Sequence, residues 1–319
     1  MEIFLAPLAL LIERQFGYPM RLIRAIGHPV IWQGRLIGLL DARFNRPGMG
    51  KRAGRLRGVL MLVLLMAATL AVTLPLSFAL RLLPFGWVVE AILATSLLAQ
   101  KELGRAVRAV GDGLSRSLAE GREAVSHIVG RDPEALDEAG VARAAIESLA
   151  ESSSDGVVAP LFFLMLFGLP GIALYKAVNT ADSMVGHKTE RHLHFGWASA
   201  RFDDVLNWVP ARLTALAIAG AAVFARGADP EAAWSSALRD AKKHESPNAG
   251  WPEAAFAGAL GFALGGPRQY GGALIDLPRF GEGRSELLAA DIYKALELYW
   301  TLLNVVLGVT LAIAVIVWL

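Results

Sequence analysis

Ionisable and carboxamide side chains gather between Glu147 and Arg212 of this 319-residue chain, and apolar segments flank that stretch. Its carboxylates suit Mg²⁺, a hard cation that proteins usually bind through one or two carboxylates together with phosphate oxygens. Its arginines and lysines suit phosphate groups. The combination predicts a site for a magnesium–nucleotide complex or a phosphorylated substrate. The candidate residues are Asp155, Asn179, Asp182, His187, Lys188, Arg191, Arg201, Asp203, Asp204 and Asn207.

A second polar group is the turn from His244 to Glu253, which leads into a short apolar segment. Its candidate residues are His244, Asn248 and Glu253. Ionisable side chains beside membrane-depth segments are costly in free energy, so both polar groups predict functional sites.

Each candidate also has a structural interpretation. Asp155 and Asp182 could cap helices, Asp203 with Asp204 could form a solvated turn, and Asn248 could be a turn residue between prolines. The cations could lie at the membrane interface with their stems along lipid. The chain contains no GxxxxGK[ST], no GxGxxG after a strand and no HExxH, so P-loop, Rossmann and zincin sites have no support.

Composition points to a membrane protein. Apolar residues make up 55% of the chain before its 32 glycines are counted, against 31 basic and 29 acidic residues. The apolar content excludes a disordered chain, and the formal net charge of +2 excludes a highly charged nucleic-acid binder. Cysteine is absent, which excludes disulfides and thiolate metal sites.

A helix needs about 20 mostly apolar residues to cross the hydrocarbon core. Full spans are expected at 58–80, 82–100 and 301–319. Broken or short membrane segments, which could be re-entrant, are expected at 156–175, 213–225 and 254–267. The polar stretch 101–155 has apolar residues at helical spacing, and Asp132-Pro133 predicts a helix start within it. The fold class is therefore all-α: a single polytopic membrane helical bundle over 1–319 with cytoplasmic helical loops.

Lysines and arginines near the spans predict the orientation. The segment from Arg35 to Arg57 holds seven basic residues and one acid, so it is expected on the cytoplasmic side. If 156–175 crosses fully, the polar stretch 179–207 lies outside. If the chain turns back at Pro170-Gly171, that stretch stays cytoplasmic, and we favour this second arrangement because two prolines interrupt the segment.

Several long motifs are specific. They are Ser154-Asp155-Gly156-Val157-Val158-Ala159-Pro160, Tyr175-Lys176-Ala177-Val178-Asn179-Thr180-Ala181-Asp182, Phe195-Gly196-Trp197, Ala200-Arg201-Phe202-Asp203-Asp204-Val205-Leu206-Asn207-Trp208-Val209-Pro210-Ala211-Arg212 and Ser246-Pro247-Asn248-Ala249-Gly250-Trp251-Pro252-Glu253. Near the N-terminus, His28-Pro29-Val30 also fits. With these motifs the chain resembles the CobD/CbiB family of cobalamin biosynthesis over nearly its whole length.

The resemblance implies a multi-pass enzyme of the cell inner membrane, with its active site expected at the cytoplasmic face. The implied reaction is carbon–nitrogen ligation: (R)-1-aminopropan-2-ol or its O-phosphate is joined to adenosylcobyric acid through an amide, with ATP as co-substrate and Mg²⁺ as cofactor. The implied partners are these substrates, the lipid bilayer and other membrane enzymes of cobalamin assembly, but no nucleic acid. The alternatives are a membrane transporter with a midplane site or a non-catalytic relative.

The resemblance also suggests roles for the candidates. Metal and metal-bound phosphate would fall to Asp155, Asp182, Asp203 and Asp204. Catalytic roles would fall to Asp182 and, as bases that deprotonate the amine, to His187 and His244. Phosphate and substrate binding would fall to Asn179, Lys188, Arg191, Arg201, Asn207, Asn248 and Glu253.

Overall fold

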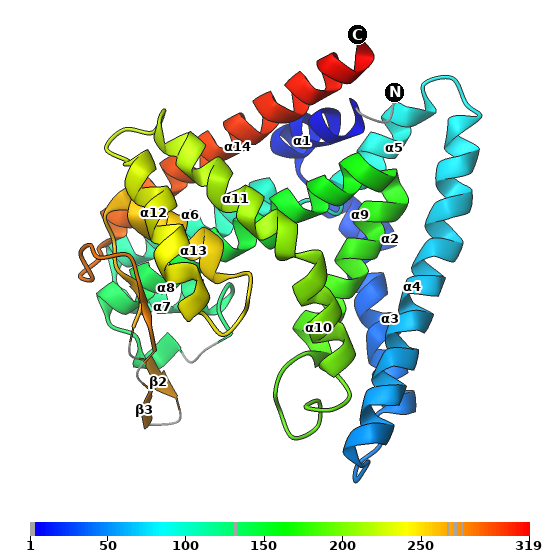
Figure 1. The fold of residues 1–319 in the computed structure, drawn as a ribbon, viewed down its shortest axis with the longest axis horizontal. Coiled ribbons are helices and arrows are strands. Elements are labelled where there is room, and N and C mark those ends of the chain that lie inside the picture. Colours follow the sequence, from blue (N-terminus) through cyan, green and yellow to red (C-terminus); the bar gives the residue numbers. More distant parts are fainter. Residues whose placement is uncertain (1–3, 131–132, 267, 271–272, 276) are drawn as a thin grey trace. The chain divides into compact units, whose positions relative to one another are not determined.

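The computed structural model describes residues 4–130, 133–266, 268–270, 273–275 and 277–319. The fold is all-α apart from four strands of two or three residues (Figure 1). Among the described residues, three helical stretches are long and apolar enough to cross a membrane: α4 (Lys51–Arg81), the stretch Glu138–Val185 and α14 (Ala289–Trp318). A fourth is added if α10 (Trp197–Leu206) and α11 (Trp208–Ala222), which meet at a bend of 45°, form one span. The predicted fold class is confirmed, and the long apolar helices indicate a multi-pass membrane protein.

The chain forms two compact units, each discontinuous in sequence. Unit 1 holds Met1–Ala99, Ala159–Asn207 and Ile313–Leu319, and unit 2 holds Gln100–Val158 and Trp208–Ala312. The single enzyme domain expected over 1–319 stays a prediction.

Unit 1 is built around the long helix α4. The other helices of the unit are α1 (Leu5–Phe16), α2 (Met20–Ile26), α3 (Pro29–Phe44), α5 (Gly86–Thr95), α9 (Ala159–Val185) and α10. Helix α4 packs against α3, α9 and α10, with Ile37, Met61 and Phe195 buried between them. Other apolar side chains of α4, such as Val72 and Phe78, are exposed, as expected where a helix faces lipid.

The 82–100 span expected from the sequence is shortened to ten helical residues in α5, about half the length that a crossing needs. Pro84 and the left-handed Phe85 (φ 60°) interrupt the chain before α5. At its end, the hydroxyls of Thr95 and Ser96 donate to the carbonyls of Ile92 and Leu93, at 2.6 and 2.7 Å. Such bonds compete with helix continuation, and a count of apolar residues does not register them.

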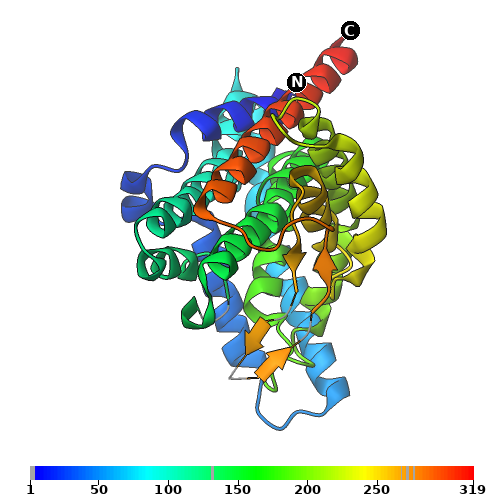
Figure 2. The same ribbon diagram turned by 90° about the vertical axis from the view of Figure 1, so that its left-hand side faces the viewer.

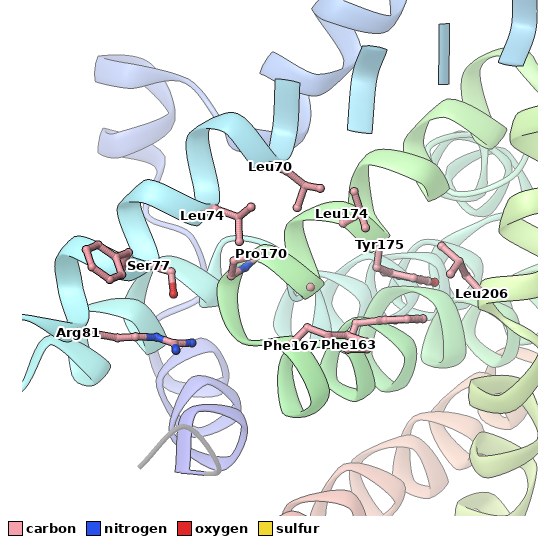
Figure 3. Close-up of a pocket in the computed structure, with 12 residues that line it drawn as sticks. Leu70, Leu74, Ser77, Arg81, Phe163, Phe167, Pro170, Leu174, Tyr175 and Leu206 are labelled. Atoms are coloured by element: carbon pink, nitrogen blue, oxygen red, sulfur yellow. The ribbon is translucent and has the colours of Figure 1, made fainter. Parts of the chain in front are cut away.

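Helix α9 is broken at Gly168 (φ 63°, ψ −154°), within the segment expected to be interrupted. The ring of Phe163 before the break stacks on Tyr175 after it, with centroids 5.2 Å apart, so the two arms of α9 fold onto each other (Figure 3). Buried Glu90 accepts hydrogen bonds from the Leu169 N–H (3.0 Å) and from Ser77 (2.8 Å). The break at Gly168 leaves the Leu169 N–H without its usual acceptor in the helix. Glu90 replaces that acceptor, because a buried N–H without a hydrogen bond is costly in free energy.

Unit 2 contains the polar stretch 101–155, which is helical as expected: α6 (Gln100–Arg116), α7 (Leu118–Ser126) and α8 (Glu138–Ser153) pack together. Asp137 caps α8 by accepting from the Gly140 N–H at 2.7 Å, whereas the cap expected at Asp132 lies outside the described residues. The predicted segments 213–225 and 254–267 fall largely in α11 and in α13 (Gly250–Leu260), both too short to cross a membrane alone.

The remaining elements of unit 2 are short, apart from α14. They are η2 (Pro133–Ala135), η3 (Ser154–Val158), α12 (Pro230–Asp240), η4 (Ala241–Lys243), β1 (Leu264–Gly265), β2 (Arg268–Tyr270), β3 (Ala273–Ile275) and β4 (Arg279–Phe280). Strand β1 pairs antiparallel with β4, and β2 with β3 (orange arrows in Figure 2).

Candidate functional site

A buried carboxylate network joins α9 to α10 in unit 1. Asp203, which is 8% exposed, accepts hydrogen bonds from the side-chain amides of Asn207 (2.9 Å) and Asn179 (3.4 Å). The amide oxygens are held in turn: Tyr175 donates to Asn207 at 2.9 Å, and Lys176 donates to Asn179 at 3.2 Å. These two donors fix the orientation of both carboxamides, so their N–H groups point at Asp203.

Helical spacing explains how these residues meet. Lys176, Asn179 and Asp182 follow one another at three-residue intervals on α9, and residues three apart share a helix face. Asp203 and Asn207 are four apart, at the end of α10. Asp182 lies close enough to Asp203 for the two carboxylates to repel each other. Among the described residues, only carboxamide side chains donate to the Asp203 carboxylate, so its own hydrogen bonds bring it no positive charge.

Two of the predicted site residues neutralise each other. Arg201 donates to Asp204 at 3.1 Å on the surface of α10. Asp204 therefore carries a positive partner that Asp203 lacks, and it is a poorer candidate for a cation ligand.

The loop after α9 is anchored to α3. Arg191 and His192 contact the carboxylate of Asp41, at 2.5 and 3.4 Å. Asn45 donates both to Asp41 (2.9 Å) and to the backbone carbonyl of Arg191 (3.2 Å). Arg191 is thus tied to an acid 150 residues away, while His187, near the start of the same loop, is exposed. Lys188 is also exposed.

The two ends of this loop, Gly186 and Gly196, lie close together, and we call them the glycine neck. Asp182 lies beside it. A Cβ on Gly186 would lie 1.9 Å from Oδ1 of Asp182, and one on Gly196 would lie 1.6 Å from the carbonyl oxygen of Val185. Only glycine allows so close an approach of backbone and side chain at these positions. The neck therefore fixes the position of the Asp182 carboxylate.

The described residues contain no group of three or more histidine, aspartate or glutamate side chains arranged to hold a metal ion. The four predicted carboxylate ligands do not form one cluster: Asp182 and Asp203 are together, Asp204 is paired with Arg201, and Asp155 belongs to unit 2. Mg²⁺ that arrives with phosphate needs only one or two carboxylates. The Asp182–Asp203 pair fits that requirement.

The second predicted group forms its own cluster in unit 2, around Arg212. The guanidinium lies between the rings of Trp208 and Trp251, 4.5 and 4.7 Å from their centroids. It donates to the Asn248 side chain at 3.0 Å and to the Trp208 carbonyl at 2.7 Å. Stacking and hydrogen bonds therefore hold this cation in place.

His244 is fixed in the same cluster. Its Nδ1 accepts from the Ser246 N–H at 2.9 Å, and its Nε2 lies 3.6 Å from the buried carboxylate of Glu253. With Nδ1 accepting, Nε2 carries the proton of the neutral ring. Both nitrogens are thus engaged, so His244 is a poorer general base than the sequence suggests.

Sequence reasoning missed Tyr175, Lys176 and His28 as members of the unit 1 network. Burial and, secondarily, the positive charge of Lys176 lower the pKa of His28, so this histidine lies near the network as a neutral ring. Its Nδ1 caps α3 by accepting from the Val30 N–H at 3.2 Å. The sequence did contain a signal for Lys176: it precedes Asn179 by three residues, so the two share one face of a helix.

An apolar cavity borders this network. Its volume is about 620 Å³, and its walls come from α4 and from both arms of α9 (Figure 3). Phe163, Phe167 and Leu174 line it, with Arg81 at its edge. Tyr175 is also part of the wall, and the same Tyr175 donates to Asn207. Apolar surface and the carboxylate network therefore adjoin through one side chain.

Together these features define a multi-pass helical membrane protein in which two neighbouring carboxylates, of buried Asp203 and half-buried Asp182, adjoin an apolar cavity. The chain belongs to the CobD/CbiB family, because the family model described as CobD/Cbib protein matches residues 6–299.

Similar proteins extend over nearly the full length. A cobalamin biosynthesis protein CobD of Sinorhizobium sp is 48% identical over 97% of both chains. The protein of the same name from Brucella suis biovar 1 is 44% identical over 98% of this chain and 96% of its own. That of Rhodobacter capsulatus is 47% identical over 90% of both. No solved structure matches the chain.

Proposed function

We propose that this protein acts in cobalamin biosynthesis as a ligase that joins (R)-1-aminopropan-2-ol, or its O-phosphate, to adenosylcobyric acid with the use of ATP and Mg²⁺. The observation that carries the proposal is the closeness of the Asp182 and Asp203 carboxylates, since two neighbouring carboxylates can bind one Mg²⁺ ion together with phosphate oxygens. Membership of the family and full-length likeness to proteins named for cobalamin biosynthesis support the substrate class.

The chemistry explains why such a site is needed. A carboxylate does not accept an amine directly, because oxide is a very poor leaving group. Attack by the substrate carboxylate on the γ-phosphorus of ATP releases ADP and gives an acyl phosphate. The amine, as free base, then attacks the acyl carbon, phosphate leaves, and the amine proton passes to a base. Mg²⁺ bound at Asp182 and Asp203 would supply charge neutralisation for the phosphoryl groups.

This scheme suggests roles for the other polar side chains of unit 1. Asn179 and Asn207 hold the Asp203 carboxylate in place, and Lys176 adds a positive charge beside this network. His187 is the proposed base, because it is exposed on the loop that Asp182 adjoins. Lys188, Arg191 and Arg201 remain the proposed phosphate-binding cations, although Arg191 and Arg201 each also pair with an acid, Asp41 and Asp204 respectively.

The predicted candidates of unit 2 stay part of the proposal. Asn248 and Glu253 would bind corrinoid amides, and Asp155 stays a proposed metal ligand within its own unit. His244 is retained only as a substrate-binding residue, since both of its nitrogens are engaged. The apolar cavity beside Tyr175 is the proposed contact for the apolar surface of the corrinoid.

The proposed site faces the cytoplasm. Within unit 1 the loop 187–196 packs against the basic segment near Asn45 and Gly54, which the distribution of positive charge predicts to be cytoplasmic. ATP is available on that side.

The test is the Asp182→Asn variant of the full chain in detergent or nanodiscs. It is incubated with adenosylcobyric acid, aminopropanol phosphate and Mg-ATP, and product amide and ADP are measured. We expect the variant to insert and fold but to form no amide, whereas Glu102→Gln, an exposed carboxylate of α6, should behave as wild type. Wild-type turnover by Asp182→Asn would remove Asp182 from the mechanism. Absence of product from the wild-type protein would reject the proposed ligase.

A further inference from the structure

A second cavity of unit 1, of about 920 Å³, lies between two loops that precede α4 and α10. One wall is the segment from Asn45 to Met49 together with Gly54, and the other is the stretch from Thr189 to Phe195. The volume falls in the range of about 300–1,000 Å³ that is usual for small-molecule sites. A phosphorylated amino alcohol would leave most of it empty.

Both walls are held in place by side chains. Arg57 donates to the Phe44 carbonyl at 3.3 Å and to the Met49 sulfur at 3.2 Å, which fixes the first loop. The ion pair between Asp41 and Arg191 fixes the second loop to α3. The cavity is therefore preformed, as sites for small ligands usually are.

The lining combines positive charge with apolar surface. Arg46 contributes from the first wall and Arg191, which also pairs with Asp41, from the second, against one acid in the lining, Glu190. Met49 and Leu193 supply apolar contact. Arginines suit phosphate oxygens, and apolar side chains suit the faces of a nucleobase. A ligand with both parts, and of this size, is a nucleoside triphosphate.

The wall formed by residues 189–195 also leads to the carboxylate pair. It belongs to the loop whose neck is Gly186 and Gly196, and Asp182 lies against Gly186. We infer that the cavity between residues 45–49 and 189–195 binds the nucleoside triphosphate, an inference that rests on the proposed ATP-dependent ligation. Arg46 binds its phosphates together with Arg191, and the loop links this site to the carboxylates that hold the metal.

Equilibrium binding of a non-hydrolysable ATP analogue with Mg²⁺, to the full chain in phosphatidylcholine nanodiscs, tests the inference. The matched pair Leu193→Asp and Leu193→Asn places the same shape in the cavity wall with and without a negative charge. We expect the aspartate variant to bind the analogue about tenfold more weakly than the asparagine variant. Arg46→Gln should weaken binding similarly, while Arg43→Gln, the same change on exposed α3 surface outside the cavity, should not.

Three further measurements decide the outcome. Inorganic triphosphate should compete with the analogue, and Arg46→Gln should raise KM for ATP without changing KM for adenosylcobyric acid. Equal affinities of Leu193→Asp and Leu193→Asn, or of Arg46→Gln and Arg43→Gln, would overturn the inference even if wild type forms amide normally. If the variants bind the analogue as expected but the wild-type protein forms no amide, the nucleotide site is upheld and the proposed ligase is rejected. Charge effects confined to phosphatidylglycerol nanodiscs, without competition by triphosphate, would assign the cavity to a lipid headgroup and overturn the inference.

Discussion

Two buried aspartates, Asp203 in unit 1 and Asp240 in unit 2, have opposite surroundings. Asp240 is 1% exposed and accepts from Arg239, Lys243 and the Gly281 N–H, each at 2.7 to 2.8 Å. Burial alone would raise the pKa of Asp240, but these hydrogen bonds and the charge of Lys243 outweigh it and hold the pKa well below its usual range. Asp203 accepts only from two carboxamides, and the nearby Asp182 repels it.

The comparison distinguishes buried charged groups that are paired within the fold from a buried carboxylate that a bound ligand could pair. A buried carboxylate is stable when it is paired and hydrogen-bonded, and Asp240 meets both conditions. Arg212 is the corresponding cation of unit 2, held by two rings and by carbonyl groups. Among the described residues, Asp203 meets only the second condition, because its hydrogen-bond donors are neutral carboxamides and the nearby Asp182 repels it. This imbalance is what a bound cation would remove.

The largest effect is expected from Asp203→Asn. The change leaves an oxygen acceptor for the neighbouring carboxamides but removes the negative charge, so amide formation should fall about 10²–10³-fold while the amount of folded protein stays unchanged. Product formation and size-exclusion chromatography in detergent measure the two quantities. A variant that retains wild-type kcat would show that Asp203, like Asp240, serves only the fold.

Gly186→Ala sharpens the comparison without changing any charge. The added Cβ would meet Oδ1 of Asp182 and displace that carboxylate, and a displacement of about 1 Å can lower a rate about 10²-fold. Gly38→Ala on α3 is the matched control, because nothing lies within 4 Å of its added Cβ. If both variants turn over like wild type, the position of Asp182 relative to the neck has no part in the reaction.

The sequence predicted elements best where one property decides the structure. The membrane helices α4 and α14 follow from long uncharged runs, and the break in α9 follows from the Leu169-Pro170-Gly171 segment beside Gly168. The span expected over 82–100 was wrong because the left-handed Phe85 interrupts the chain before α5, and the helix then runs only from Gly86 to Thr95. Hydropathy does not contain that information.

The candidate site shows the same division. Helical spacing brings Asn179 and Asp182 to one face of α9, and it could have added Lys176 by the same rule. The partners of the cations could not be predicted, because Arg191 pairs with Asp41, 150 residues away, through tertiary packing. Residue types thus predicted which side chains matter for charge, but only the fold decides which charges are already neutralised.

Asp240→Asn is the counterpart of the Asp203 variant in unit 2. It removes the negative charge and one of the two oxygens that accept from Arg239, Lys243 and the Gly281 N–H, so the free energy of unfolding should fall by about 1–3 kcal/mol. The folded fraction should keep its kcat for amide formation. Thermal unfolding in detergent, followed by circular dichroism, measures the loss, and Asp229→Asn, a change that keeps an exposed helix cap of α12, serves as the control. A lower kcat in folded Asp240→Asn protein would contradict the division drawn between the two units.

The smallest effect is the pH dependence that Asp240 should add to the stability of the fold. A carboxylate whose pKa is lower in the folded than in the unfolded protein stabilises the fold fully above its unfolded pKa, which is about 3.9 for aspartate, and this stabilisation is lost as the pH falls further toward the folded value. The difference in Tm between wild type and Asp240→Asn should therefore be constant from about pH 7 to 5 and shrink at lower pH. Asp203→Asn should not reproduce this shrinking difference, because no cation donates a hydrogen bond to Asp203 among the described residues. A difference in Tm for Asp240→Asn that persists unchanged on acidification would mean that the bonds to Arg239, Lys243 and Gly281 do not depend on the charge of this carboxylate.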